Sequence, residues 1–64
     1  MAKIIFKEIG SDEEIKQAAE LIGKHLRYSY HPEEKEQPAY GDITDDDIDL
    51  LITHGYNVNL VEAD

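Results

Sequence analysis

Alternation of apolar and polar residues predicts a strand at each end of the chain. Residues 56–62 place apolar side chains at every second position, which is the pattern of a strand with one buried face. Residues 2–9 hold the run Ile4-Ile5-Phe6, and β-branched and aromatic side chains of this kind favour strands. We therefore expect the chain to begin and end in a sheet.

A first helix is predicted after Ser11, because Ser11 and Glu14 have the spacing of a capping box. Apolar residues then recur with the helical period, namely Ile15, Ala18, Ala19, Ile22 and Leu26. Pro32 disfavours helical geometry just before it, so we expect this helix to end between Lys24 and Tyr28. Gly23 is then an internal weak point that costs roughly 1 kcal/mol relative to Ala.

A second helix has clear signals at both ends. Thr44 is a suitable N-cap, and the acids at 45–47 fill the first turn, where the helix dipole favours negative charge. Ile43 and Ile48 have the spacing of a hydrophobic staple. Gly55 is placed to end the helix in a left-handed conformation.

The segment between the two helices predicts a long acidic loop over residues 31–42, because two Xaa-Pro steps interrupt it and Gly41 closes it. Leu26, Tyr28 and Tyr30 alternate just before it, so a short third strand there is an alternative. The predicted fold class is α+β. We expect a small β-α-α-β domain with two helices packed on a short antiparallel sheet, completed by a third short strand or by a dimer partner.

The chain, residues 1–64, is predicted to be one domain with a thin core. A chain of 64 residues buries only about 60% of its unfolded surface, and small domains usually need disulfides, a metal or oligomerisation. The sequence has no cysteine, so homodimerisation stays open as an alternative. The N-terminus has only a three-residue apolar run between charges, which excludes a signal peptide or membrane span and favours the cytoplasm.

Charge divides the sequence into two unequal halves. The net charge is −9, from 15 acids and 6 bases. Residues 1–27 hold five bases and five acids, whereas residues 28–64 hold one base and ten acids. A field of this sign repels nucleic acid and acidic membranes and attracts basic partners. We therefore expect a protein partner with a basic surface and no direct contact with nucleic acid or membrane.

Residues suited to catalysis or metal binding do not form a recognisable pattern. A calcium loop that starts at Asp42 needs Gly at its sixth position and Glu at its twelfth, which here are Asp47 and Thr53. Zinc sites need closely spaced ligands, and the histidines are distant from one another: His25, His31 and His54. Ser11 and Thr44 are better explained as helix caps than as nucleophiles. We expect no enzyme activity, no metal and no cofactor.

Partner contacts are predicted for the acids of the C-terminal half and for two tyrosines near them. Tyrosine is enriched in protein interfaces, and aromatic rings beside carboxylates suit surfaces rich in Arg or Lys. Helix capping explains part of the run at 45–47, but it does not explain Asp49. The predicted partner-binding residues are Tyr30, Glu33, Glu34, Glu36, Tyr40, Asp42, Asp45, Asp46 and Asp49.

In size, acidity and lack of a catalytic motif, the chain resembles the small acidic inhibitors that phages encode against bacterial nucleic-acid-handling enzymes. That resemblance implies an anti-defence protein that mimics nucleic acid and acts in the host cytoplasm. The charge itself predicts a protein-binding module, an inhibitor that occupies a basic, nucleic-acid-binding surface of another protein. The alternative is a structural or regulatory subunit, antitoxin-like or a small homodimer, that binds through its apolar faces.

Overall fold

The computed structural model describes residues 1–63 as a four-stranded sheet with two helices. The elements in chain order are β1 (Ala2–Lys7), α1 (Asp12–Ile22), β2 (Arg27–Tyr28), β3 (Glu36–Gly41), α2 (Asp45–Thr53) and β4 (Asn57–Glu62). The strands lie in the order β2-β3-β1-β4, and all three neighbouring pairs are antiparallel. This is the β-α-β-β-α-β topology called ferredoxin-like or split β-α-β.

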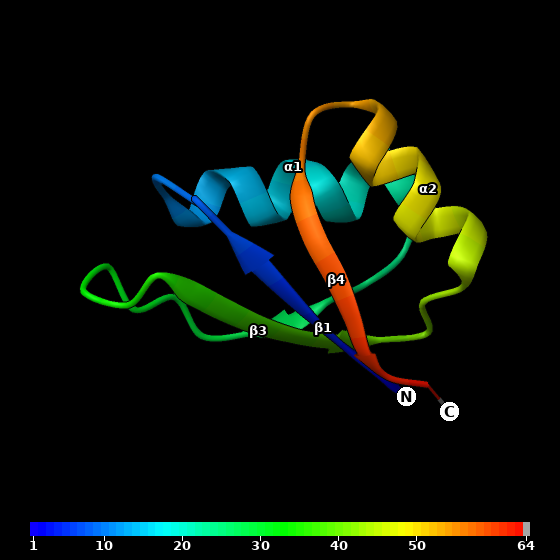
Figure 1. Cartoon of the computed structure of the whole chain (residues 1–64), viewed down its shortest axis with the longest axis horizontal. Helices are drawn as coiled ribbons and strands as arrows, with labels where there is room; N and C mark the ends of the chain where they lie inside the picture. Colours follow the sequence, from blue (N-terminus) through cyan, green and yellow to red (C-terminus); the bar gives the residue numbers. More distant parts are fainter. Residues whose placement is uncertain (64) are drawn as a thin grey trace.

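The molecule has two layers, with both helices on one face of the sheet (Figure 1). Strand side chains alternate between the two faces, so every second residue of β1 and β3 is buried under the helices. The residues that form this core are Ala2, Ile4, Phe6, Ile15, Ala18, Leu26, Ala39, Ile43, Ile48, Leu51 and Val58. No described helix covers the opposite face of the sheet.

The predicted fold class is confirmed, because two helices pack on an antiparallel sheet in an α+β arrangement. The short third strand is present as β2, in which Arg27 pairs with Tyr40 and Tyr28 pairs with Ala39. The sheet contains a further strand, β3, that the sequence did not predict. It lies between β2 and β1 and therefore in the interior of the sheet.

The predicted loop over residues 31–42 is wrong in its second half, where β3 forms. This strand pairs with β1 along its whole length, from Glu36 opposite Lys7 to Gly41 opposite Ala2. Pro38 favoured a loop, because proline cannot donate to a β ladder. However, β2 pairs with β3 only as far as Ala39, so β3 is an edge at Pro38, which is where sheets tolerate proline.

Helix α1 ends at Ile22, earlier than predicted. Gly23 has a left-handed φ of 69°, and its N–H and that of Lys24 donate to the carbonyls of Glu20 and Ala19 at 3.1 Å each. This is the geometry of a glycine stop signal. Gly23 therefore ends α1 and is not an internal weak point.

Helix α2 follows its predicted start and stop signals. The Thr44 hydroxyl accepts the N–H of Asp47 at 3.3 Å, and the Asp47 carboxylate accepts the N–H of Thr44 at 3.0 Å. At the other end Gly55 has a φ of 92°, and the N–H of Tyr56 donates to the Leu51 carbonyl at 3.0 Å. Both signals depend on residues close in sequence, which is why the sequence alone placed this helix.

Candidate functional site

The structure divides the predicted partner-binding acids into two groups. Glu33, Glu34 and Glu36 lie on the β2–β3 connection and at the first residue of β3, and we call them the acidic loop. Asp42, Asp45, Asp46 and Asp49 follow the last residue of β3, and we call them the α2 acidic end. A six-residue strand is about 20 Å long, and Figure 1 shows the β2–β3 connection and the start of α2 on opposite sides of the molecule. The acids predicted together are thus two separate surfaces.

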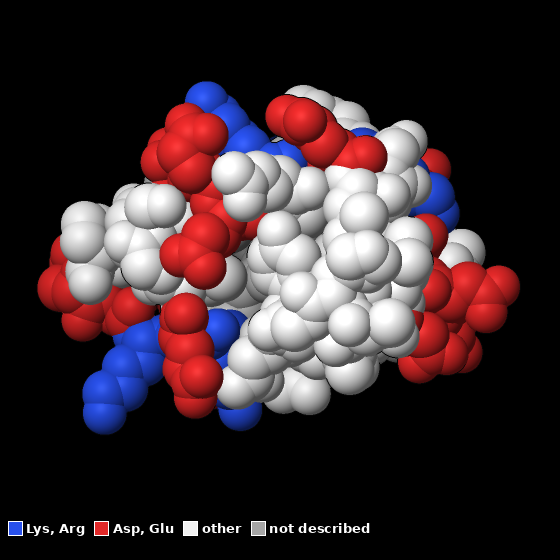
Figure 2. Space-filling view, turned by 90° about the horizontal axis from the view of Figure 1, so that it is seen from above, with Lys and Arg blue, Asp and Glu red and all other residues white. Residues whose placement is uncertain are grey.

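The α2 acidic end places four exposed carboxylates beside two exposed aliphatic side chains. None of the four forms an ion pair with another residue of 1–63. Leu50 and Ile52 keep 38% and 52% of their surface exposed. Asp46 precedes Leu50 by four residues and Asp49 precedes Ile52 by three, so these two acids each neighbour an aliphatic side chain. Leu50 and Ile52 are two residues apart and therefore flank the acids on opposite sides. Figure 2, a view onto the helical layer, shows a broad uncharged area toward the α2 side with acids along its margin.

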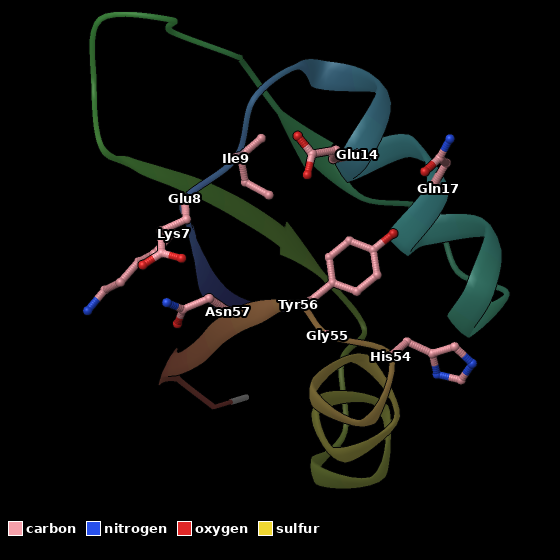
Figure 3. Close-up of a pocket in the computed structure, with 9 residues that line it drawn as sticks. All are labelled: Lys7, Glu8, Ile9, Glu14, Gln17, His54, Gly55, Tyr56 and Asn57. Carbon is pink, nitrogen blue, oxygen red and sulfur yellow. The ribbon is translucent and has the colours of Figure 1, made fainter.

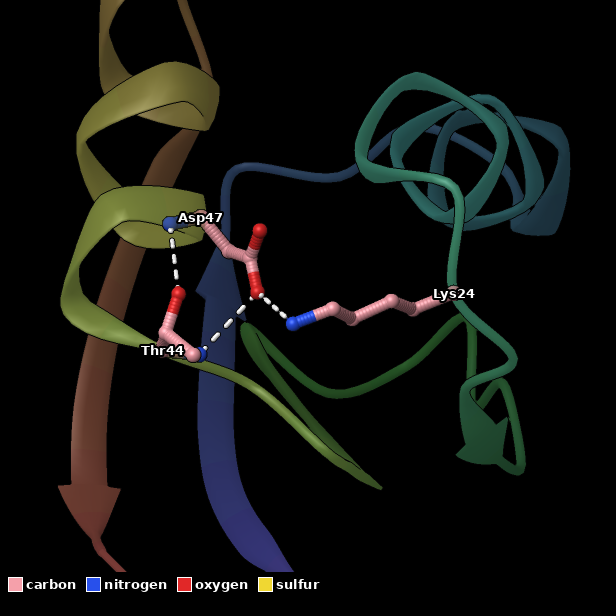
Figure 4. A network of polar contacts seen from close by, with 3 residues as sticks. All are labelled: Lys24, Thr44 and Asp47. Carbon is pink, nitrogen blue, oxygen red and sulfur yellow. Dashed lines mark hydrogen bonds and ion pairs between the residues drawn. The ribbon is translucent and has the colours of Figure 1, made fainter.

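Asp47, in contrast, binds other residues of the chain and so helps to position α2 (Figure 4). Its Oδ2 lies 2.5 Å from Nζ of Lys24, and it also accepts the N–H of Thr44. The side chains of Asp47 and Lys24 are only 14% and 31% exposed, so water screens this ion pair weakly. The contact joins the residue after the α1 stop signal to the first turn of α2, and it takes Asp47 out of any partner surface.

The protonation of Asp47 follows from these contacts. Partial burial raises the pKa of its carboxyl group, but the hydrogen bond and charge of Lys24 and the two hydrogen bonds with Thr44 lower that pKa more. The net pKa lies below the ordinary value of 3.8. The carboxylate therefore stays charged at neutral pH and loses its ion pair only in acid.

The acidic loop is held by a neutral side chain, Gln37, which is only 1% exposed. Its Oε1 accepts the N–H of His31 at 3.0 Å. Its Nε2 donates to the carbonyls of His31 and Glu34 at 2.7 and 2.9 Å. These three hydrogen bonds satisfy the buried amide and fix the backbone over residues 31–34. The predicted structureless segment is thus ordered, and no local sequence signal identifies Gln37 as its anchor.

The two predicted tyrosines occupy different places. Tyr30 is half-buried against the core, and its hydroxyl donates to the Ile9 carbonyl at 3.4 Å. Tyr40 lies on the sheet face turned away from the helices, is 40% exposed, and has Nζ of Lys3 at 5.9 Å from its ring centroid. Tyr30 therefore supports the fold, and Tyr40 belongs to a surface other than the helical layer.

A shallow hollow of about 210 Å³ lies between the β1–α1 turn, the start of α1 and the α2–β4 turn. Figure 3 shows the Tyr56 ring in its middle and the side chains of Lys7 and His54 pointing outward. The Glu14 carboxylate accepts the N–H of Ser11 at 3.1 Å, and the Tyr56 ring packs edge-on against Phe6 with centroids 6.2 Å apart. These lining groups support the β1–α1 turn, and no nucleophile is hydrogen-bonded to a base among them.

Sequence reasoning missed a further surface, the sheet face turned away from the helices, which we call the open face. Strand alternation and register place on it Lys3, Ile5, Lys7, Arg27, Glu36, Pro38, Tyr40, Asn57, Asn59 and Glu62. Within residues 1–63, it holds three of the six bases and only two of the fourteen acids. Because these bases come from separate strands, only the strand pairing reveals that they share a face.

Comparison with protein-family models, with curated proteins and with solved structures finds no match for this chain. Within residues 1–63, no three or more His, Cys, Asp or Glu side chains are grouped so that they could hold a metal ion. No helix in the same range is long and apolar enough to cross a membrane. The α2 acidic end is the candidate site because its exposed carboxylates adjoin exposed aliphatic side chains.

Proposed function

We propose that this chain is a protein-binding module that occupies a basic surface of another protein, with the α2 acidic end as its contact site. The observation that supports this function is the combination of four exposed carboxylates without ion pairs and the exposed side chains of Leu50 and Ile52 on α2. Protein interfaces combine apolar and polar contacts, and this end of the molecule offers acids flanked by one exposed aliphatic side chain on each side.

The carboxylates select the partner and speed its approach. Four negative charges within eight residues produce a concentrated negative potential, which attracts basic surfaces and raises the association rate. Lys24 contacts the same helix, but its charge is already matched by Asp47. Lys24 therefore does little to weaken the negative potential at the α2 acidic end.

The aliphatic side chains supply affinity that charge alone lacks. Leu50 and Ile52 keep between a third and just over a half of their surface exposed, so burying each against a partner is worth about 1 kcal/mol. Excluding water from these side chains also lowers the local dielectric constant, which strengthens the ion pairs formed by the acids between them. The contact would thus be stronger than a purely electrostatic one.

A nucleic-acid-binding surface has the chemistry that fits this site. Such surfaces display Lys and Arg side chains that neutralise phosphates, and a row of carboxylates offers them equivalent negative charges. A chain bound there excludes the nucleic acid, so it acts as an inhibitor and nucleic-acid mimic. The phage proteins that the chain resembles in size and acidity act in this way, and this proposed role implies a location in the cytoplasm, that of the host if a phage encodes the chain.

The experiment compares two matched charge variants. The tagged chain captures its partner from a lysate of the source organism, and the purified partner is then titrated calorimetrically. We expect Asp45→Asn with Asp46→Asn to weaken binding at least 10-fold, and Glu33→Gln with Glu34→Gln, which removes the same charge from the acidic loop, to change it less than threefold. Binding should weaken as salt rises toward 0.3 M, and the chain should displace nucleic acid from the partner.

Full binding by the Asp45→Asn, Asp46→Asn variant contradicts the proposed function. Combined with loss of binding by Ile52→Ser, that result supports the alternative of a regulatory subunit that binds through its apolar surface. Equal weakening by the two charge variants also contradicts it, since binding then depends on net charge rather than on the α2 acidic end.

A further inference from the structure

The open face has an apolar centre that no described helix covers. Ile5 of β1 lies in the middle of the sheet, opposite Pro38 of β3 and Asn59 of β4. Tyr40, two residues beyond Pro38 on the same face, is 40% exposed. Hollows of about 440 and 310 Å³ lie on either side of Pro38 and give the face relief into which a partner's side chains can fit. This surface is independent of the α2 acidic end.

The charge of the open face differs from that of the rest of the molecule. Its three bases, Lys3, Lys7 and Arg27, stand against two acids, Glu36 and Glu62. The rest of the described chain holds three bases and twelve acids, a net charge of −9. A second copy of the chain is therefore repelled by most of this molecule and least repelled at the open face.

The size of the open face matches what a stable dimer needs. The molecule measures 28 × 22 × 17 Å and has an accessible surface of 4122 Å². One of the two 28 × 17 Å faces of a block with these dimensions makes up about a sixth of its surface, which corresponds to roughly 670 Å² of accessible surface per copy. Two such faces bury at most about 1,300 Å² in total, which is at the lower end of the range of specific interfaces.

We infer that the open face is a self-association surface, through which two copies of this chain form a two-fold symmetric dimer with their sheets facing each other. In a two-fold interface the same patch meets itself. A face that carries both signs of charge can then place Lys and Arg of one copy opposite Glu of the other. A domain of 64 residues also gains the second apolar layer that its thin core lacks.

The dimer would leave both functional ends free. The α2 acidic end belongs to the helical layer, and the helices lie on the outer side when two sheets face each other (Figure 1). Each dimer would therefore present two acidic contact sites, and a partner with two basic surfaces would gain avidity. Self-association itself does not depend on partner binding.

Sedimentation equilibrium of the full chain, from about 5 to 500 µM, tests the inference. We expect the wild-type mass to rise to that of two chains, and Tyr40→Glu to weaken the dimer at least 10-fold, because it removes an aromatic contact and buries a carboxylate in the interface. The matched control is Leu21→Glu, which places the same charge at a comparably exposed position of α1 and should leave the dimer within threefold of wild type. Circular dichroism verifies that each variant is folded.

A wild-type chain that stays at the mass of one copy up to 500 µM overturns the inference. So does a dimer that Tyr40→Glu leaves intact, or one that Leu21→Glu breaks as strongly. The Asp45→Asn, Asp46→Asn variant should still dimerise, and more tightly at low salt, because it removes self-repulsion. Its loss of partner binding with an intact dimer separates this surface from the α2 acidic end.

Discussion

The acidic loop and the α2 acidic end carry the same kind of charge, but different interactions hold them in place. The loop is fixed by the neutral amide of Gln37, which makes three hydrogen bonds to the backbone of residues 31–34. The helix end is fixed by the charged side chain of Asp47, which bonds Thr44 and Lys24. The hydrogen bonds of Gln37 therefore do not depend on pH or salt, whereas the ion pair of Asp47 depends on both.

This difference teaches that a cluster of like charges can be held either by a neutral group or by an acid whose charge a base compensates. Glu33, Glu34 and Glu36 repel one another, and a neutral anchor keeps their loop ordered whatever their protonation. At the α2 acidic end the anchor is itself an acid, and it tolerates its neighbours because Lys24 supplies the opposite charge. Three comparisons between variants separate the two cases.

The largest effect is expected from Gln37→Leu, which keeps the side-chain volume and removes the amide. The N–H of His31 and the carbonyl of Glu34 lose the partner that Gln37 supplies, and the carbonyl of His31 keeps only the N–H of Glu34 at 3.0 Å. The free energy of unfolding should therefore fall by about 2–4 kcal/mol. Urea denaturation measures this change, and hydrogen exchange should show faster exchange of the His31 amide.

The matched control for this variant is Gln17→Leu, the same substitution at an exposed position of α1. It should change the free energy of unfolding by less than about 0.5 kcal/mol. A loss of similar size in both variants would show that the amide of Gln37 is not the anchor of the acidic loop.

A smaller effect is expected from Asp47→Asn, which removes the charge that faces Lys24. The loss of the ion pair and of part of the helix cap should lower the free energy of unfolding by about 1–2 kcal/mol at pH 7. The control is Asp46→Asn, at the neighbouring exposed position, which should cost less than half as much.

The stability gap between the wild type and Asp47→Asn should depend on pH. The pKa of Asp47 in the folded chain lies below its ordinary value of 3.8, so the unfolded chain binds the proton more readily. The stabilisation by Asp47 is therefore complete above the ordinary pKa and is lost as the pH falls through the folded pKa. Denaturation curves from about pH 6 to pH 2 should show the two proteins converging, and a constant gap would disprove the ionic role of Asp47.

The smallest effect distinguishes the acids themselves. Asp45→Asn with Asp46→Asn removes charge from the first turn of α2, where the helix dipole favours it, and should cost about 0.5–1 kcal/mol. Glu33→Gln with Glu34→Gln removes charge from a loop without a dipole and should leave stability unchanged or raise it by up to about 0.5 kcal/mol. Thermal denaturation at low salt measures both, and a larger loss in the loop variant would reverse the comparison.

Sequence reasoning succeeded where the determining interactions are local. The start of α2 depends on Thr44 and Asp47, three residues apart, and its end on the conformation of Gly55. The strands at the two ends of the chain can be recognised from their own residue types and from the alternation of apolar and polar positions. The same local reasoning failed at β3. Pro38 is tolerated in this strand because β2 ends its pairing at Ala39, and that pairing cannot be seen in the residues around Pro38.

The sequence by itself determined the two helices, the strands at the two ends of the chain, the α+β class and the excess of acid, since each follows from residues a few positions apart or from composition. Only the tertiary structure decided that the acids form two groups rather than one, that Gln37 and the Lys24–Asp47 pair anchor them, and that Lys3, Lys7 and Arg27 share the open face. The physical reason is that these relations join residues on separate elements, and strand order and register, which bring them together, are set by the packing of the whole core.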